Sequence, residues 1–135
     1  MKKLVLVFMS LLVMVFSSAC HSDKPGILFN MEPITTENAM HYTSVFDKNQ
    51  RIYYLIFTPK PVETGMIEIQ IIKKDNQYAR YGYKLFWTHS ARLKEEQIYY
   101  YDDYVVIPEK GAYIMKVYSK DNPTKPLCMA QFFVK

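Results

Sequence analysis

The sequence has few of the features that catalysis or phosphate binding requires. It contains two cysteines, Cys20 and Cys128, and four glycines in 135 residues. Four glycines are too few for a glycine-rich loop that cradles a phosphate group. The sequence also lacks a Gly-x-Ser-x-Gly or His-Glu-x-x-His motif and a closely spaced cysteine–histidine set for zinc. We therefore expect a protein that is not an enzyme and that uses no cofactor and no metal ion.

A strong charge of one sign and helical periodicity are also missing. The formal net charge is +4, from 17 basic and 13 acidic residues. Lys2 and Lys3 belong to a separate N-terminal segment, and without them 15 basic residues face 13 acidic ones, a net charge of +2. The basic residues are scattered, so we expect no nucleic-acid partner. No run of ten or more residues has clear helical periodicity, which argues against a parallel α/β sheet.

The first twenty residues form a distinct pattern. Two lysines follow Met1, residues 4–16 are apolar except for one serine, and small residues at 17–19 precede Cys20. The apolar run is too short for a permanent transmembrane helix. The pattern resembles bacterial lipoprotein precursors, in which Cys20 would receive fatty acyl chains such as palmitate and the signal peptide 1–19 would be removed. Ser17 departs from that family, which usually has leucine there.

An ordinary secretory signal peptide is the alternative interpretation. Ser17 and Ala19 also suit the general signal peptidase, and Cys20 could then form a disulfide with Cys128 in an oxidising compartment. Lipidation would instead leave Cys128 unpaired. The two interpretations differ in the mass of the N-terminal residue.

The resemblance to lipoproteins implies a location in the bacterial cell envelope. Several acyl chains would anchor the chain stably to a membrane. Residues 20–26 would be the lipid attachment site and a short tether, whose five residues 21–25 span roughly 17 Å when extended. His21 stands where aspartate retains lipoproteins in the inner membrane of enteric bacteria. An outer-membrane location is therefore favoured if the source has two membranes.

The remaining residues, 27–135, have the pattern of a single all-β domain. Aromatic residues make up 16% of the chain, and they fit the pleated surface of a sheet. Ile67, Ile69 and Ile71 alternate with polar residues, as in a half-buried strand. Turn signals recur about every ten residues, which predicts an antiparallel β-sandwich of about seven strands. The predicted strands are 27–29, 52–58, 66–74, 79–88, 98–107, 113–118 and 127–134.

Two segments fit this pattern less well. Residues 34–49 are compatible with one helical turn beginning at residues 35–38, or with a loop throughout that contains a short strand near 41–46. Residues 90–97 are charged and are interpreted as a loop with one helical turn. The alternation elsewhere predicts a core made of Tyr54, Ile56, Ile67, Ile69, Ile71, Leu85, Tyr113, Val117 and Phe132.

The segment 110–115 resembles the tyrosine corner of immunoglobulin-like sandwiches. Its sequence is Lys-Gly-Ala-Tyr-Ile-Met, and in those folds a tyrosine opens the penultimate strand. Tyr113 would be that tyrosine, and Met115 stands where true immunoglobulin domains have a cysteine, which excludes the disulfide-bonded subtype. The alternative is that a glycine and a tyrosine simply begin a strand after a turn.

Candidates for chemistry are few. We expect His89 to lie in a loop at a strand end and Cys128 to be a buried structural thiol. Asp102 and Asp103 are adjacent in a predicted strand, so their carboxylates point to opposite faces and cannot converge on a metal ion.

Aromatic residues are better candidates for a binding surface. We predict that Trp87, Tyr99 and Tyr101 form it, with Tyr100 and Tyr104 pointing inward, because tyrosine is enriched at interfaces. The alternative is that these rings only stabilise the sheet as cross-strand pairs.

The leading functional hypothesis is a membrane-anchored, non-catalytic β-sandwich that binds another envelope component, with a protein as the favoured partner. One alternative is a glycan or small-ligand binder that stacks sugars on tyrosine and tryptophan. Another is an inhibitor or immunity-type lipoprotein that uses the loop 90–97.

Overall fold

The computed structural model describes residues 24–74, 82–97 and 99–135. The predicted signal peptide 1–19, Cys20, the predicted turn at Asp75 and Asn76, and Ile98 lie outside the described residues. Within the described ranges the chain forms eight strands and one short 3-10 helix, η1. The elements are β1 (Gly26–Asn30), β2 (Val45–Phe46), β3 (Arg51–Phe57), β4 (Met66–Lys74), β5 (Tyr83–Arg92), η1 (Glu95–Gln97), β6 (Tyr100–Val106), β7 (Gly111–Ser119) and β8 (Cys128–Val134).

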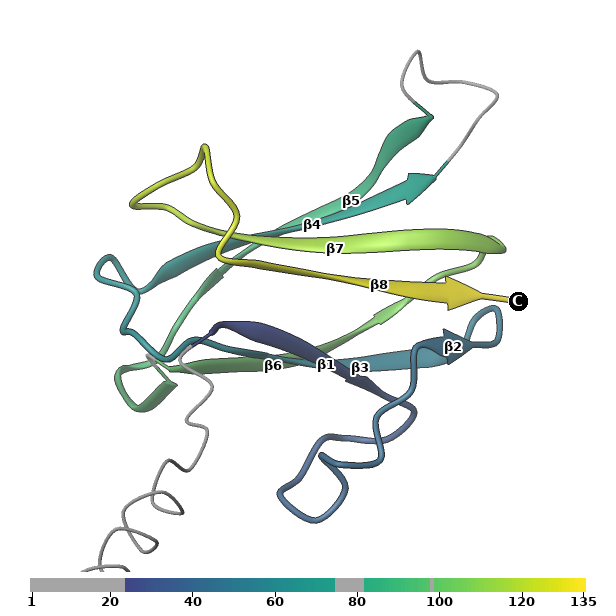
Figure 1. Ribbon diagram of the computed structural model, residues 1–135, viewed down its shortest axis with the longest axis horizontal. Helices are drawn as coiled ribbons and strands as arrows, with labels where there is room; N and C mark the ends of the chain where they lie inside the picture. The colour runs from purple at the N-terminus through teal and green to yellow at the C-terminus, as the bar shows by residue number, and fades with distance from the viewer. Residues whose placement is uncertain (1–23, 75–81, 98) are drawn as a thin grey trace, which may run out of the picture.

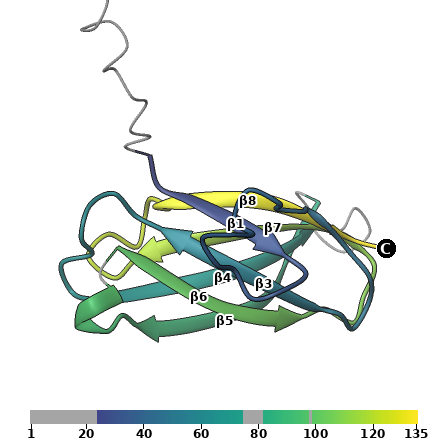
Figure 2. The same ribbon diagram turned by 90° about the horizontal axis from the view of Figure 1, so that it is seen from below.

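The strands form two sheets that pack face to face (Figure 1). One sheet has the order β1-β3-β6 and the other the order β2-β8-β7-β4-β5. The view turned by 90° shows the strands of the two layers crossing at a modest angle (Figure 2). All pairings are antiparallel except that of β2 with β8, which is parallel. The predicted all-β sandwich is confirmed.

The core follows from alternation along the long strands. In β4, Ile67, Ile69 and Ile71 are at most 1% exposed, while the residues between them are half-buried. Tyr113 and Phe132 stack at 5.4 Å between ring centroids in neighbouring strands β7 and β8. Eight of the nine predicted core residues are buried: Tyr54, Ile56, Ile67, Ile69, Ile71, Tyr113, Val117 and Phe132.

The ninth, Leu85, was wrongly predicted to be buried, because β5 contains a β-bulge. Ile71 pairs with Trp87 and Ile72 pairs with Leu85, so Phe86 is an extra residue in β5. A bulge interrupts the alternation of faces. Phe86 packs edge-on against Tyr113 at 5.4 Å, and Leu85 turns outward and is 57% exposed.

The sandwich is immunoglobulin-like. Strands β1, β3 and β6 occupy the order of strands A, B and E, and β8, β7 and β4 that of G, F and C. The Tyr113 hydroxyl donates a hydrogen bond of 2.7 Å to the carbonyl oxygen of Glu109, which is the contact that defines a tyrosine corner. Met115 is fully buried two residues later.

The structures of segments 34–49 and 90–97 agree in part with those predicted from the sequence. The backbone N–H of Ala39 bonds the carbonyl of Thr35 at 3.0 Å, which closes one turn, and β2 is the short strand expected near residues 41–46. The helical turn expected within 90–97 is η1. Residues 90–92 were wrongly assigned to a loop, because β5 continues to Arg92 beside β4.

Candidate binding face

The outer face of the three-stranded sheet is rich in aromatic residues. The odd-numbered residues of β3 point away from the core, and the register with β6 pairs Tyr53 with Tyr104 and Phe57 with Tyr100. The same face of β1 carries Leu28, which pairs with Leu55. We call this surface the aromatic face; it consists of Leu28, Tyr53, Leu55, Phe57, Tyr100, Tyr104 and Val106.

The exposure of the aromatic face is high for apolar side chains. Tyr100, Tyr104 and Val106, all on the edge strand β6, are 41%, 45% and 43% exposed, and the other four residues are half-buried. An antiparallel sheet with one wet face normally places polar residues there. Asp102 and Arg51 share this face, and apolar side chains gathered on one face mark interaction sites more often than scattered apolar residues do.

A cluster of two rings and one cation lies at the centre of the face. The Tyr53 and Tyr104 rings are 5.7 Å apart between centroids, with planes tilted by 52°. The guanidinium carbon of Arg51 lies 4.8 Å from the centroid of the Tyr104 ring. A hydrogen bond with the Tyr53 side chain raises the pKa of Arg51. The register of β3 and β6 therefore builds a fixed aromatic pair with one cation at its edge.

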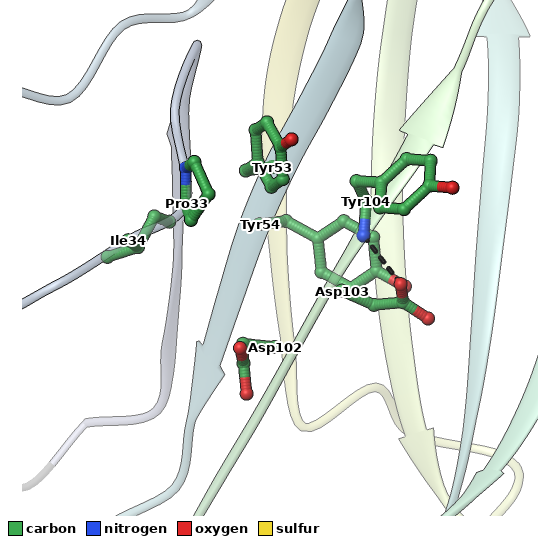
Figure 3. Close-up of a pocket in the computed structure, with 7 residues that line it drawn as sticks. All are labelled: Pro33, Ile34, Tyr53, Tyr54, Asp102, Asp103 and Tyr104. Carbon is green, nitrogen blue, oxygen red and sulfur yellow. Dashed lines mark hydrogen bonds between the residues drawn. The ribbon is translucent and has the colours of Figure 1, made fainter.

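A cleft of about 230 Å³ opens beside this pair (Figure 3). Tyr53, Tyr104 and Asp102 border it on the sheet side, and Pro33 and Ile34 border it from the segment after β1. Tyr54 and Asp103 complete its lining.

Two asparagine side chains hold the wall of the cleft outside the sheet. The Asn38 side chain accepts a 2.8 Å hydrogen bond from the Thr35 N–H and donates one of 2.9 Å to the Pro33 carbonyl. A second amide, of Asn30, donates to the Asn38 carbonyl at 3.3 Å. These bonds fix the turn after β1 and with it the position of Pro33 and Ile34.

The two aspartates of β6 diverge, as the sequence predicts. Asp102 pairs across the sheet with Leu55, and Asp103 pairs with the core residue Tyr54. Figure 3 shows the Asp102 carboxylate directed away from that of Asp103. Within the part of the chain that the structure describes, Asp102 forms no salt bridge.

Tyr101 lies on the inner side of β6 and not on the exposed face. Its ring packs against the core, and its hydroxyl donates a 3.1 Å hydrogen bond to Asp103. Burial, followed by the nearby Asp103 charge, raises the pKa of Tyr101 to about 12. The orientation predicted for this strand is therefore wrong, because Tyr100 and Tyr104 point outward. The apolar residues Val105 and Ile107 are both buried. Strict alternation from them along the strand would have placed Asp103 and Tyr101 on the same inner side.

The other two predicted binding residues are also placed by the structure. Trp87 is half-buried in β5, packs against the core and stacks on His89 at 5.5 Å between centroids. His89 lies inside β5 opposite Ile69, and not in a loop as expected. Tyr99 precedes β6 and is 50% exposed. Trp87 and Tyr101 thus contribute to the interior, and Tyr99 alone of the predicted set stays largely in solvent.

The described residues offer little reactive chemistry. Among residues 24–74, 82–97 and 99–135, no three histidine, cysteine, aspartate or glutamate side chains are grouped to hold a metal ion. Cys128 is buried as expected, and burial raises the pKa of its thiol to about 12. In the same described ranges, no helix is long and apolar enough to cross a membrane.

No protein-family model matches the chain, and no curated protein matches it. Solved structures with a similar shape include an immunoglobulin-like protein from Pseudomonas aeruginosa, at 12% identity and a TM-score of 0.46, over 83% of this chain and 90% of that one. The soluble domain of PmoD from Methylocystis sp. is similar at 10% identity and a TM-score of 0.47, over 82% and 90%. A CARDB domain from Pyrococcus furiosus has 11% identity and a TM-score of 0.41, over 82% and 90%. Similarity this distant carries no ligand, activity or partner over to this chain.

Proposed function

We propose that the chain is a membrane-anchored bacterial lipoprotein whose sandwich binds another protein of the cell envelope through the aromatic face. The observation that carries the proposal is the exposure of Tyr100, Tyr104 and Val106, each above 40%, beside four half-buried apolar residues. Tyrosine is enriched at protein interfaces because it offers a broad apolar plate and a polar tip. The proposed role is binding and not catalysis.

The position of the face relative to the anchor supports this role. The face belongs to the sheet that contains β1, and β1 begins at Gly26, six residues after Cys20. A lipidated Cys20 would hold this sheet within a short tether of the membrane. The partner would then be a protein at or near the same membrane. This is the outer membrane if, as in enteric bacteria, aspartate after the lipidated cysteine is the inner-membrane signal, because His21 stands there instead.

A protein partner fits the face better than a glycan does. Sugars stack on ring faces that are open to solvent, but Arg51 lies over the Tyr104 ring and Tyr53 packs beside it. An inhibitor that inserts a loop is also less favoured. The segment 90–97 is shortened by the extension of β5, and the backbone N–H of Leu93 is bonded to the Gly65 carbonyl at 2.7 Å.

The anchor is tested by Cys20→Ala. We expect this change to abolish labelling by a fatty-acid analogue and to leave the protein uncleaved or soluble. The mass of the N-terminal peptide of the wild type should show acyl chains on Cys20. Membrane retention and labelling that survive the substitution would exclude the lipoprotein interpretation.

The face is tested by replacing Tyr100 and Tyr104 with serine together. Both side chains are more than 40% exposed, so the melting temperature should change little while an identified envelope partner no longer co-purifies. The matched control replaces Tyr83 and Leu85, exposed residues of β5 in the other sheet, and should leave the partner bound. Equal retention by the two double variants would place the binding surface elsewhere.

A further inference from the structure

We propose that the cleft beside Tyr53 and Tyr104 receives a cationic side chain, lysine or arginine, from the protein that binds the aromatic face. This proposal rests on the proposed function and adds the chemistry that the partner must present. It is based on one unpaired carboxylate, two aromatic walls and the size of the cleft.

Asp102 supplies the charge. Its carboxylate is exposed and forms no salt bridge with any residue in the described ranges. Asp103 also lines the cleft, and its carboxylate accepts hydrogen bonds from the Tyr101 hydroxyl and the Tyr104 N–H. Asp103 points to the other side of the sheet, so the negative charge of the cleft comes from Asp102, which favours a positive group beside it.

Arg51 does not supply that positive group. On the outer face, three successive cross-strand pairs of β3 and β6 form rows: Arg51 with Val106, Tyr53 with Tyr104, and Leu55 with Asp102. Arg51 and Asp102 therefore lie on opposite sides of the tyrosine pair. Each row spans two residues, so the two outer rows are roughly 13 Å apart along the strands. Among the described residues, Arg51 contacts the Tyr104 ring and no salt bridge joins it to Asp102.

The aromatic walls are already seen to accept a cation. Arg51 lies 4.8 Å above the Tyr104 ring, well within the distance of about 6 Å at which a cation is attracted by a ring. Tyr53 presents a second ring, tilted by 52° to the first. A second cation in the cleft would lie beside both rings and reach Asp102, which forms no salt bridge among the described residues.

The size of the cleft indicates a side chain and not a larger ligand. Its volume of about 230 Å³ is below the range of roughly 300–1,000 Å³ that is usual for small-molecule sites. A metal ion is not favoured, because the carboxylates of Asp102 and Asp103 diverge (Figure 3). A long cationic side chain would fill the cleft with its apolar stem against Pro33 and Ile34 and bring its charge to Asp102.

The experiment titrates the full-length protein, purified in mild detergent, with acetyl-lysine-methylamide and follows backbone amide shifts by NMR. The neutral comparison is acetyl-norleucine-methylamide, which has no ammonium group, and glucose is the comparison for a sugar. We expect saturable shifts for Tyr104 and Ile34 with the lysine compound, in the millimolar range, and at least fivefold weaker binding of norleucine.

Asp102→Asn keeps the shape of the side chain and removes its charge. It should weaken the binding of the lysine compound by up to about fivefold, the upper end for an exposed ion pair. Asp47→Asn is the matched control, since Asp47 is exposed and its only ion pair among the described residues, with Lys135, is long at 3.9 Å. That variant should bind as the wild type does.

Equal binding of the lysine and norleucine compounds, saturation by glucose alone, or unchanged binding by Asp102→Asn would each overturn the cation proposal. These outcomes leave the proposed function standing if the Tyr100 and Tyr104 double variant still loses its partner. If that double variant keeps its partner while Asp102→Asn loses lysine binding, the proposed function fails. Cation binding by the cleft would then stand without a role for the aromatic face.

Discussion

The bulge in β5 gives a prediction that separates two neighbouring residues. Uninterrupted alternation would bury Leu85 and expose Phe86. In the structure Phe86 packs on Tyr113 and Leu85 is 57% exposed. We therefore expect Phe86→Ala to destabilise the domain and Leu85→Ala to have little effect.

The magnitudes follow from burial. Replacing a fully buried phenylalanine by alanine costs about 3–5 kcal/mol. Phe86 is half-buried, so we expect about 2 kcal/mol, including the loss of its edge-on contact with Tyr113, worth about 0.5–1.5 kcal/mol. Substitutions at exposed positions such as Leu85 usually lie within about 0.5 kcal/mol.

Urea denaturation followed by fluorescence measures both changes. With a slope of about 1–3 kcal/mol per molar urea, Phe86→Ala should lower the midpoint by roughly 1 M and leave the slope unchanged. Leu85→Ala should leave the midpoint near that of the wild type. If Leu85→Ala costs as much as Phe86→Ala or more, the bulge is not where the structure has it.

Three further outcomes follow from the core and its titratable groups. Ile69→Ala should lower the free energy of unfolding by about 2–5 kcal/mol, measured by urea denaturation, because Ile69 is fully buried in β4, an interior strand between β7 and β5. An unchanged urea midpoint would contradict the register of β4. Tyr113→Phe should lower the free energy of unfolding by about 0.5–1.5 kcal/mol, because it removes the hydrogen bond to the Glu109 carbonyl. A change near zero in the same assay would mean that this bond does not stabilise the fold. Burial raises the pKa values of Tyr101 and Cys128 to about 12, above the roughly 10 and 8.5 of unfolded chains. The folded protein should therefore be most stable below about pH 8 and lose stability as the pH rises toward 12. A melting temperature that is constant from about pH 8 to 12 would refute this pH dependence.

Strands with strict alternation were predictable from sequence. In β4 the isoleucines alternate with Glu68 and Gln70, and the buried face follows directly from that pattern. The tyrosine corner at Tyr113 was predictable for a similar reason, because a turn containing Gly111 precedes it and defines the start of β7.

The aromatic face was harder to predict because β6 carries aromatic residues on both sides. Tyr100, Tyr101 and Tyr104 do not distinguish inside from outside by residue type. The face is decided by Val105 and by cross-strand pairing with β3, which joins Tyr101 to the buried Ile56 and Tyr100 to the outward Phe57. That pairing is a long-range contact, which local alternation does not contain.

The cleft could not be found from the sequence at all. Its outer wall, Pro33 and Ile34, comes from the turn that Asn38 closes, about 70 residues away from Asp102 and Tyr104. Of the residues predicted on and beside β6, Tyr99 is exposed as expected and Tyr101 points inward, against the prediction.

Photo-crosslinking in living cells tests the central claim, that the aromatic face binds an envelope protein. A photoreactive amino acid replaces Tyr100 on the aromatic face or, as the control, Met129, which is 62% exposed on the other sheet. We predict one discrete adduct from position 100, identified by mass spectrometry as an envelope protein, and no such adduct from position 129. The same adduct formed equally from both positions, or from position 129 alone, would contradict the account.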